Sequence, residues 1–506
     1  MSTTQAYSEN PFVSSHALFE VLTARLSSNE TGAMTHGEVE ELLDLDGNAV
    51  LRQLFQDHLE LRAQRERRRV VVEGADGVLR THSRARTRTL NTMFGKVEVE
   101  RFAYSGRQST SLCPMDADLN LPPEQYSDGL RRRVAEESAR GSFDEAVEAV
   151  VRNTATAVPK RQAEMLASVA SGDFDAFYET RSLGSAEDVT DPLILTVDGK
   201  GIVMRREDLR PQTRKVAERN PRPRSNPRTG KELSGRRRMA TVASVYTVAR
   251  NMRSPEDVVG EVRGGEGIEA TNKSERPRAR NKRVWASVKK PAEEVIEEVF
   301  AEALRRDPGR KREWVVLVDG DPTQIERIVK IAKRLGIEIT MVLDFIHVLQ
   351  YLWEAANALE GTGTVAAERW VCKRALRLLE GRVSDVAAGI RRSATLRNLK
   401  GQRRKAVDKC VDYLLKYRDM IIYDECLVAG YPIATGVIEG ACRHLIKDRL
   451  DITGARWSVD GAEAILRLRS LRASGDFDEY WRFHQRQRLE TNHLRRYAAD
   501  ELRRAG

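Results

Sequence analysis

Three short apolar runs in the middle of the chain each end in an aspartate, and this feature constrains the fold most. The runs and their acids are Leu193 to Val197 before Asp198, Trp314 to Val318 before Asp319, and Ile337 to Leu343 before Asp344. Apolar runs of this length that end in turn residues are typical of buried strands. Open α/β sheets place their sites beyond the carboxyl ends of strands, so we expect the three carboxylates at one edge of a sheet.

The order of elements from Pro192 to Ala355 indicates the type of sheet. Gly199-Lys-Gly201 separates two apolar runs and predicts a tight turn between two strands, with Asp198 at the end of the first. A third apolar run follows, and then helices and strands alternate. Three strands followed by this alternation is the order of the RNase H-like fold, an α/β fold with a mixed sheet flanked by helices. In that order Asp198 lies on the first strand and Asp319 on the fourth, which are neighbours in the sheet.

A chain of 506 residues is too long for one hydrophobic core, so we expect several domains. The predicted segments are an N-terminal helical region (1–69), a small β unit and loop (70–126), a helix-turn-helix-like DNA-binding unit (127–186), the first part of the RNase H-like core (187–360), an all-helical insertion (361–432), the closing helix of the core (433–475) and a basic helical tail (476–506).

The net charge of +10 favours a polyanionic partner, although many soluble proteins are mildly basic. In the 127–186 unit, Lys160 and Arg161 stand at the front of the last of three predicted helices, where a helix-turn-helix contacts DNA. An ordinary three-helix packing unit is the alternative. The excursion from Arg205 to Arg238, which ends in Arg236, Arg237 and Arg238, is predicted to be a loop that binds phosphates or else a solvated linker.

The five cysteines are scattered and include no Cys-x-x-Cys pair, which favours buried free thiols over a zinc site or a disulfide framework. No window approaches the roughly 20 apolar residues of a membrane span, and the first residues are polar. We therefore expect a cytoplasmic protein.

A further carboxylate lies far downstream, in Gly436-Val-Ile-Glu439-Gly440. Glu439, Arg443 and Lys447 follow one another in steps of four and are predicted to share one face of a helix. Glu439 could form a surface pair with Arg443. The two glycines beside it favour close approach by another group, because glycine costs about 1 kcal/mol in a helix relative to alanine.

These motifs together carry a family resemblance. The order Asp-Gly-Lys, Val-Asp-Gly, Asp-Phe-Ile-His and Gly-Val-Ile-Glu-Gly, with Lys-x-Arg and a tryptophan downstream, resembles that of the DDE transposases of bacterial insertion sequences. The Kra-type group and its Mutator-like relatives are most similar, over roughly residues 127 to 469. The resemblance implies a catalytic triad of Asp198, Asp319 and Glu439, which would also be the metal ligands, with Asp344 and His347 in support. It also implies an all-helical insertion before Glu439.

The expected chemistry is cleavage of DNA by water and joining by a free 3′-OH. Both are in-line displacements at phosphorus that two Mg²⁺ ions can assist, with Mn²⁺ as a substitute. The expected partner is double-stranded DNA, both the terminal inverted repeats of an element and target DNA, with a homo-oligomer assembling on it and the protein nucleoid-associated when bound. Arg443 and Lys447 are further candidates for DNA contacts. The alternatives are a catalytically silent DNA-binding protein and a nuclease without strand transfer.

Simpler roles are open for several acids. Asp198 and Asp319 could begin turns, and Asp321 could replace Asp319 as the ligand, although Asp319 directly ends the apolar strand. Asp344 would make a good helix N-cap and His347 a hydrogen-bonded core histidine.

Overall fold

The computed structural model describes residues 10–181, 190–219, 236–262, 277–452, 454–499 and 501, and the chain forms two units. Unit 1 contains residues 1–180 and 476–506, and unit 2 contains residues 181–475. In sequence, unit 2 is therefore an insertion between two segments of unit 1. The segment predicted as a separate tail, 476–506, belongs to unit 1.

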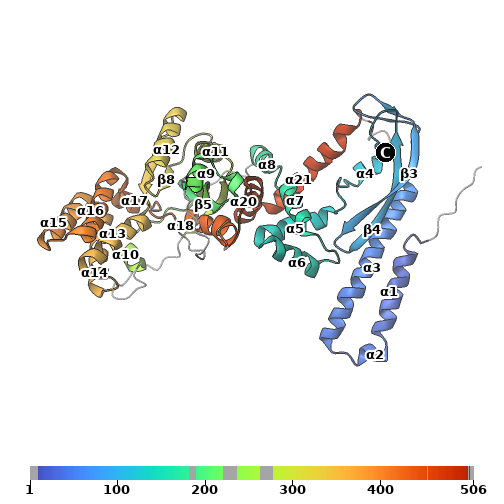
Figure 1. Cartoon of the computed structure of the whole chain (residues 1–506), viewed down its shortest axis with the longest axis horizontal. Helices are drawn as coiled ribbons and strands as arrows, with labels where there is room; N and C mark the ends of the chain where they lie inside the picture. Colours follow the sequence, from blue (N-terminus) through green and yellow to red (C-terminus); the bar gives the residue numbers. More distant parts are fainter. Residues whose placement is uncertain are drawn as a thin grey trace, which may run out of the picture. The chain divides into compact units, whose positions relative to one another are not determined.

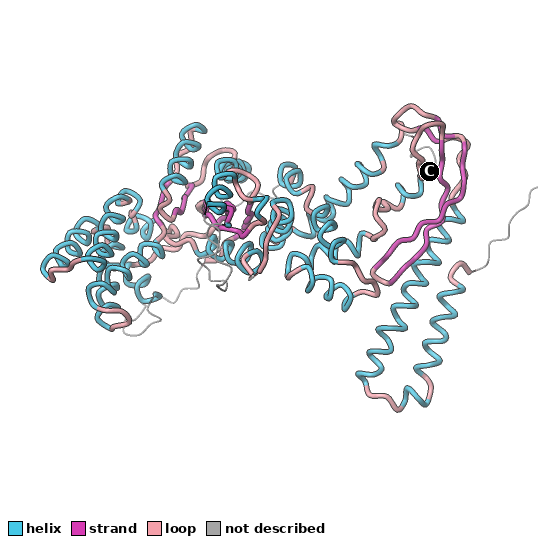
Figure 2. The backbone as a smooth tube through the Cα atoms, viewed as in Figure 1, coloured by secondary structure: helices cyan, strands magenta, loops and turns pink. Residues whose placement is uncertain are grey.

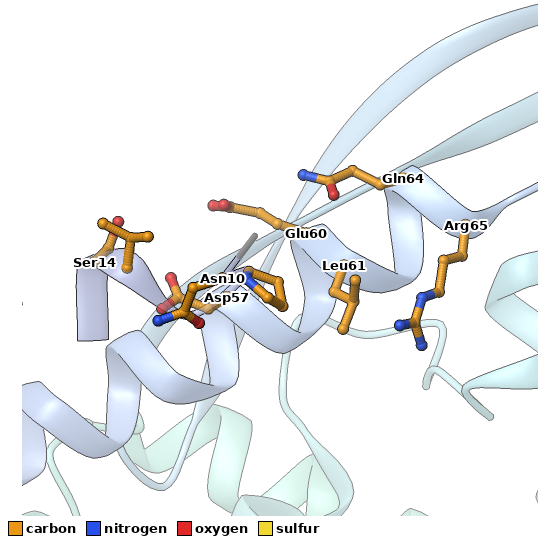
Figure 3. Close-up of a pocket in the computed structure, with 9 residues that line it drawn as sticks. Asn10, Ser14, Asp57, Glu60, Leu61, Gln64 and Arg65 are labelled. Carbon is orange, nitrogen blue, oxygen red and sulfur yellow. The ribbon is translucent and has the colours of Figure 1, made fainter. Parts of the chain in front are cut away.

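Unit 1 begins with a helical hairpin and a long β-hairpin. Its first elements are α1 (Val13–Leu26), α2 (Asn29–Gly32), α3 (His36–Arg65), β1 (Val72–Glu73), β2 (Leu79–Arg80), β3 (His82–Thr92), β4 (Gly95–Ser105) and α4 (Pro114–Asp118). α1 packs on α3, and the second half of α3 packs along β4 (Figure 1). The β3–β4 hairpin is antiparallel over its whole length. An open pocket lies between the start of α1 and the end of α3, where Asp57, Glu60, Gln64 and Arg65 line it (Figure 3).

Three helices follow where the sequence predicted them. They are α5 (Asp128–Arg140), α6 (Phe143–Asn153) and α7 (Lys160–Ala170), and unit 1 is completed by α8 (Phe174–Thr180), α21 (Phe477–Asn492) and η5 (Leu494–Arg496). Ser142 and Glu145 form a reciprocal capping box that fixes the start of α6. Leu130, Val134 and Leu166 are fully buried in the core that joins α5, α6 and α7.

Unit 2 is built on a five-stranded mixed sheet, so the predicted α/β class is confirmed. Its strands are β5 (Leu193–Val203), β6 (Arg237–Thr247), β7 (Arg280–Ser287), β8 (Trp314–Val318) and β9 (Thr340–Leu343). They lie in the order β7-β6-β5-β8-β9. β5, β6 and β7 pair antiparallel, whereas β5, β8 and β9 pair parallel. The first and fourth strands are neighbours, as predicted.

The helices of the first part of unit 2 connect and cover these strands. They are η1 (Arg206–Asp208), α9 (Pro211–Arg219), α10 (Pro255–Val262), α11 (Ala292–Arg306), α12 (Pro322–Leu335) and α13 (Phe345–Glu360). α11 packs against β6, and the later helix α20 (Val459–Ser474) packs against β7.

The predicted turn after Asp198 is wrong, because β5 is one continuous strand. It pairs with β6 without interruption from Leu193 opposite Thr247 to Val203 opposite Arg237. The glycines of Gly199-Lys-Gly201 make room for side chains of the neighbouring strand, since a Cβ at Gly201 would lie 2.9 Å from Cδ of Arg237. Pairing with β6 along the whole length of β5, which a single sequence does not show, overrides the local tendency to turn.

The basic excursion also differs from its prediction at its end. Arg237 and Arg238 begin β6 and bind within unit 2: Arg237 pairs with Asp451 at 2.9 Å, and Nε of Arg238 donates to the carbonyl of Val288 at 2.9 Å. They therefore do not belong to a phosphate-binding loop. The part of the excursion from 220 to 235 lies outside the described residues.

Helices fill the stretch predicted to be all-helical, and Figure 2 shows them in cyan. They are α14 (Val365–Leu379), α15 (Val383–Leu396), α16 (Gly401–Lys416), η3 (Arg418–Met420) and α17 (Tyr423–Ala429). A continuous helical stretch follows, made of α18 (Gly436–Ala441), the π-helical segment η4 (Cys442–Lys447) and α19 (Asp448–Leu450). Within the described part of the chain, no helix has the length and hydrophobicity needed to cross a membrane.

Candidate active site

The parallel strands bring three of the predicted acids to one edge of the sheet. Thr196 of β5 pairs with Leu317 of β8, and this register, continued by two residues, places Asp198 beside Asp319. The backbone N–H of Asp344, directly after β9, donates to the carbonyl of Val318 at 2.7 Å, beside the start of the Asp319 turn. The edge where parallel strands end is where open α/β sheets carry their sites.

The surroundings of Asp319 favour the neutral form of its carboxyl group. Burial raises its pKa, the negative charges of Asp198 and Asp321 raise it further, and His347 acts in the opposite direction. Asp321 has a different role, because its Oδ1 accepts from the backbone N–H groups of Thr323 and Gln324 and so caps α12. Asp319 also accepts a backbone N–H, from Asp321, and the choice of Asp319 as the ligand stays a prediction.

Asp344 is a fully buried hydrogen-bond acceptor at the centre of the site. Its Oδ1 accepts from the backbone N–H groups of Ile346 (3.0 Å) and Thr435 (3.3 Å), and its Oδ2 accepts from the hydroxyl of Thr435 and lies 2.9 Å from Nδ1 of His347. Asp344 caps α13, as its simpler interpretation predicted. It also ties His347 to Thr435, the residue before the helix that carries Glu439.

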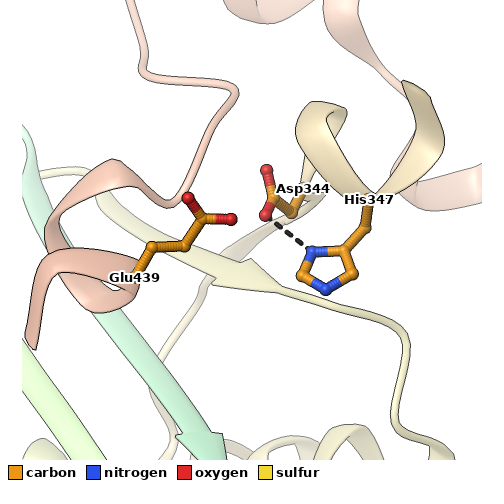
Figure 4. Close-up of side chains that lie close together, drawn as sticks. All are labelled: Asp344, His347 and Glu439. Carbon is orange, nitrogen blue, oxygen red and sulfur yellow. Dashed lines mark hydrogen bonds and ion pairs between the residues drawn. The ribbon is translucent and has the colours of Figure 1, made fainter. Parts of the chain in front are cut away.

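Asp344, His347 and Glu439 form a group whose ligand atoms lie within 4.8 Å of one another (Figure 4). The hydrogen bond to Asp344 raises the pKa of His347, and the charges of Asp344, Asp319 and Asp198 add to this effect. Burial raises the pKa of Glu439, and the negative charges of Asp344 and Asp198 raise it further. The alternative interpretation of Glu439, a surface pair with Arg443, is not what the described residues show, since Arg443 pairs with Asp448.

Two residues that the sequence analysis did not select complete the site. The buried thiol of Cys442 donates to Oδ2 of Asp198 at 3.0 Å and links β5 to the Glu439 helix. Burial and the charge of Asp198 raise the pKa of Cys442, as they do for Glu439, and the positive charge of Lys200 opposes both shifts. Lys200 follows Asp198 by two residues in a strand, and Cys442 follows Glu439 by three in a helix, so the strand and helix periods could have placed both.

All five predicted catalytic and supporting residues therefore share one site, on β5 and at the starts of the segments after β8 and β9, with Glu439 on α18. The predicted DNA-contacting residues are more dispersed. Lys160 and Arg161 are exposed at the start of α7 in unit 1, where Lys160 pairs with Asp144. Arg443 and Lys447 are exposed on η4.

The donor set fits a divalent cation. Burial and neighbouring acids raise the pKa values of Asp319 and Glu439, so their ionised forms gain from a positive ion nearby, and hard cations prefer carboxylate oxygens. The group around Asp344 could hold a metal ion, but each oxygen of Asp344 already accepts two hydrogen bonds. Asp344 is thus better suited to orient His347 than to bind a metal. Asp198 accepts from the N–H of Gly199 and the thiol of Cys442, and Asp319 accepts from the N–H of Asp321, so these two acids and Glu439 keep more coordination capacity than Asp344.

Comparison of the sequence with protein-family models and with curated proteins finds no match to either.

Proposed function

We propose that the chain is a Mg²⁺-dependent DNA transposase of the DDE type, with an RNase H-like catalytic core in unit 2. The observation that carries the proposal is the convergence of Asp198, Asp319 and Glu439 at the carboxyl edge of the sheet from three separate elements. The strand order, with three antiparallel strands followed by two parallel ones, supports the RNase H-like assignment.

Each residue of the site has a role in this proposal. Asp198, Asp319 and Glu439 would hold two Mg²⁺ ions, or Mn²⁺ in their place, which when bound activate the attacking oxygen and stabilise the leaving one. Asp344 fixes His347 and the start of the Glu439 helix through its four hydrogen bonds. Lys200 places a positive charge beside the carboxylates, where the phosphate of a DNA strand would lie.

DNA recognition is proposed for unit 1, with α7 reading sequence through Lys160 and Arg161. The helical arrangement of α5, α6 and α7 and the exposed cations at the start of α7 support this assignment. Arg443 and Lys447 stand exposed on the segment that follows Glu439, and their charges suit contacts to the phosphates of the bound strand. The proposed protein acts as a homo-oligomer assembled on DNA.

The test uses the terminal DNA of the proposed element, which lies on either side of the coding sequence. Asp198→Asn, Asp319→Asn and Glu439→Gln should each abolish strand cleavage and joining in Mg²⁺ while binding of the same DNA persists, since only metal ligands are removed. Asp321→Asn is the matched control, because asparagine also caps helices and activity should remain.

The products separate this function from its alternatives. Cleavage without joining to target DNA would indicate a nuclease, and binding without cleavage by the wild-type protein would indicate a silent DNA-binding protein. Full activity in any of the three acid variants would contradict its assignment as a ligand.

A further inference from the structure

Two tyrosines of the helical insertion hold the backbone that carries Asp319. The hydroxyl of Tyr413 donates to the carbonyl of Asp319 at 2.8 Å, and the hydroxyl of Tyr417 donates to the carbonyl of the next residue, Gly320, at 2.5 Å. Tyr413 lies on α16 and Tyr417 directly follows that helix. The two hydroxyls therefore bind successive peptide groups at the point where β8 ends.

The turn itself is shaped to receive these side chains. Gly320 adopts φ +94°, and a Cβ at this position would lie 2.9 Å from the hydroxyl oxygen of Tyr413 and 3.0 Å from its ring. A larger residue would be strained in this conformation and would also displace the tyrosine. Gly320 thus meets two requirements at once, a left-handed turn and close approach of the ring.

The tyrosines are held in place by further aromatic contacts. Tyr413 stacks on Tyr351 of α13 with ring centroids 3.9 Å apart, and Tyr417 meets Tyr413 edge to face at 5.0 Å. Tyr413 and Tyr417 are both buried. Their ring positions are therefore fixed by packing, and their hydroxyls reach the turn without further ordering.

The neighbouring strand end has the same type of contact. The hydroxyl of Tyr423, on α17, donates to the carbonyl of Leu343 at 3.0 Å, one residue before Asp344. Tyr423 packs edge to face on Phe345. The insertion thus binds the backbone at the ends of β8 and β9, two of the three strands that carry acids of the site.

We propose that Tyr413 and Tyr417 are positioning residues that set the direction of the Asp319 carboxylate through the backbone of residues 319 and 320. The insertion is then part of the active-site scaffold and not an independent appendage. This role deepens the proposed function, on which the identity of Asp319 as a metal ligand rests. A shift of about 1 Å in a reacting group can cost about 100-fold in rate, so two backbone hydrogen bonds are enough to matter.

The test removes only the hydroxyls. In the double variant Tyr413→Phe/Tyr417→Phe, amide hydrogen exchange of residues 320 and 321 should be about tenfold faster than in wild type, because two hydrogen bonds to the turn are lost while the rings stay packed. Mn²⁺ binding, followed by electron paramagnetic resonance, should weaken, and the rate of DNA cleavage should fall about 10- to 100-fold.

Tyr351→Phe is the matched control, since it changes the same aromatic stack but lies on α13 and has no described bond to the turn. Faster exchange in the double variant with wild-type exchange in Tyr351→Phe supports the proposal, whether or not the wild-type protein cleaves DNA. Unchanged exchange at residues 320 and 321, or an equal change in Tyr351→Phe, overturns it. If the double variant does not fold, Tyr417→Phe alone decides by the same comparison.

Discussion

At the scale of single residues, Asp319 combines a proposed catalytic role with an effect on stability. Its pKa in the folded protein is raised by burial and by the charges of Asp198 and Asp321. Between the ordinary aspartate pKa of about 3.9 and the raised value, the folded state holds more protons than the unfolded state. Stability therefore falls as the pH rises through this window and stays lower at neutral pH. The acid that the proposed chemistry needs therefore opposes folding when no cation is bound.

Asp319→Asn should consequently raise the melting temperature at pH 7 in buffer with a chelator, because it removes the opposed charge and keeps an acceptor for the N–H of Asp321. The difference from wild type should shrink as the pH is lowered toward about 3.9. Added Mg²⁺ should stabilise the wild type but not the variant, since a ligand that binds only the folded state raises stability. Thermal unfolding with Asp321→Asn as control checks this, and a lower melting temperature for Asp319→Asn at pH 7 would contradict it.

The sequence allowed the acids to be predicted but not all of their partners. Asp198, Asp319 and Asp344 follow apolar runs, which are visible in sequence, and the parallel register then brings them together. The hydrogen bonds of Asp344 to Thr435 and of Asp198 to Cys442 join residues far apart in the chain. Such pairs depend on how helices and strands pack, so local sequence patterns do not predict them.

At the scale of elements, the start of β6 shows how a charge pattern can mislead. Arg237 and Arg238 end a run of cations in the sequence but bind Asp451 and the carbonyl of Val288. β7 was not predicted, because Arg280-Asn-Lys-Arg283 begins it with polar residues and only Val284 to Ala286 reads as a strand. Strand pairing decides both cases. β6 pairs with β5 and β7 pairs with β6, and such partners are not visible in a single sequence.

Arg237→Gln should reduce stability by about 1 kcal/mol or less, because it removes a partly exposed ion pair with Asp451 and a bond to the carbonyl of Gly201. The salt dependence of DNA binding should remain that of wild type, since Arg237 is already paired within the protein. Chemical denaturation and binding titrations at several salt concentrations measure the two effects. A weaker salt dependence of DNA affinity with unchanged stability would mean that Arg237 contacts phosphates, as the sequence analysis predicted.

At the scale of the whole molecule, the two segments of unit 1 meet at their ends. The hydroxyl of Tyr178 donates to Asp476 at 2.8 Å, and His484 lies 2.7 Å from Asp173. Phe177 packs edge to face on Tyr480, so α8 and α21 share a core. The sequence indicated a helix after Phe477 but not its partner, because contacts between residues about 300 positions apart leave no periodic signal.

A chain in which a short Gly-Ser linker replaces residues 181–475 should therefore fold as unit 1 and bind terminal DNA in preference to random DNA. A fragment ending at residue 180 should be less stable, because Phe177 and Tyr178 lose the residues that cover them. Circular dichroism melting and gel shifts with both DNAs compare the two shortened proteins. Equal stability of the two would mean that α21 does not belong to the core of unit 1, and equal affinity for both DNAs would move sequence recognition elsewhere.

The division of unit 1 by unit 2 also sets an order of events during translation. Domains fold as their residues leave the ribosome, and α21 emerges only after all of unit 2 has been made. The proposed catalytic unit can then reach its fold while the unit proposed to recognise DNA still lacks its closing helix. A chain that stops early would carry the acids of the proposed active site without the complete unit that is proposed to select the DNA.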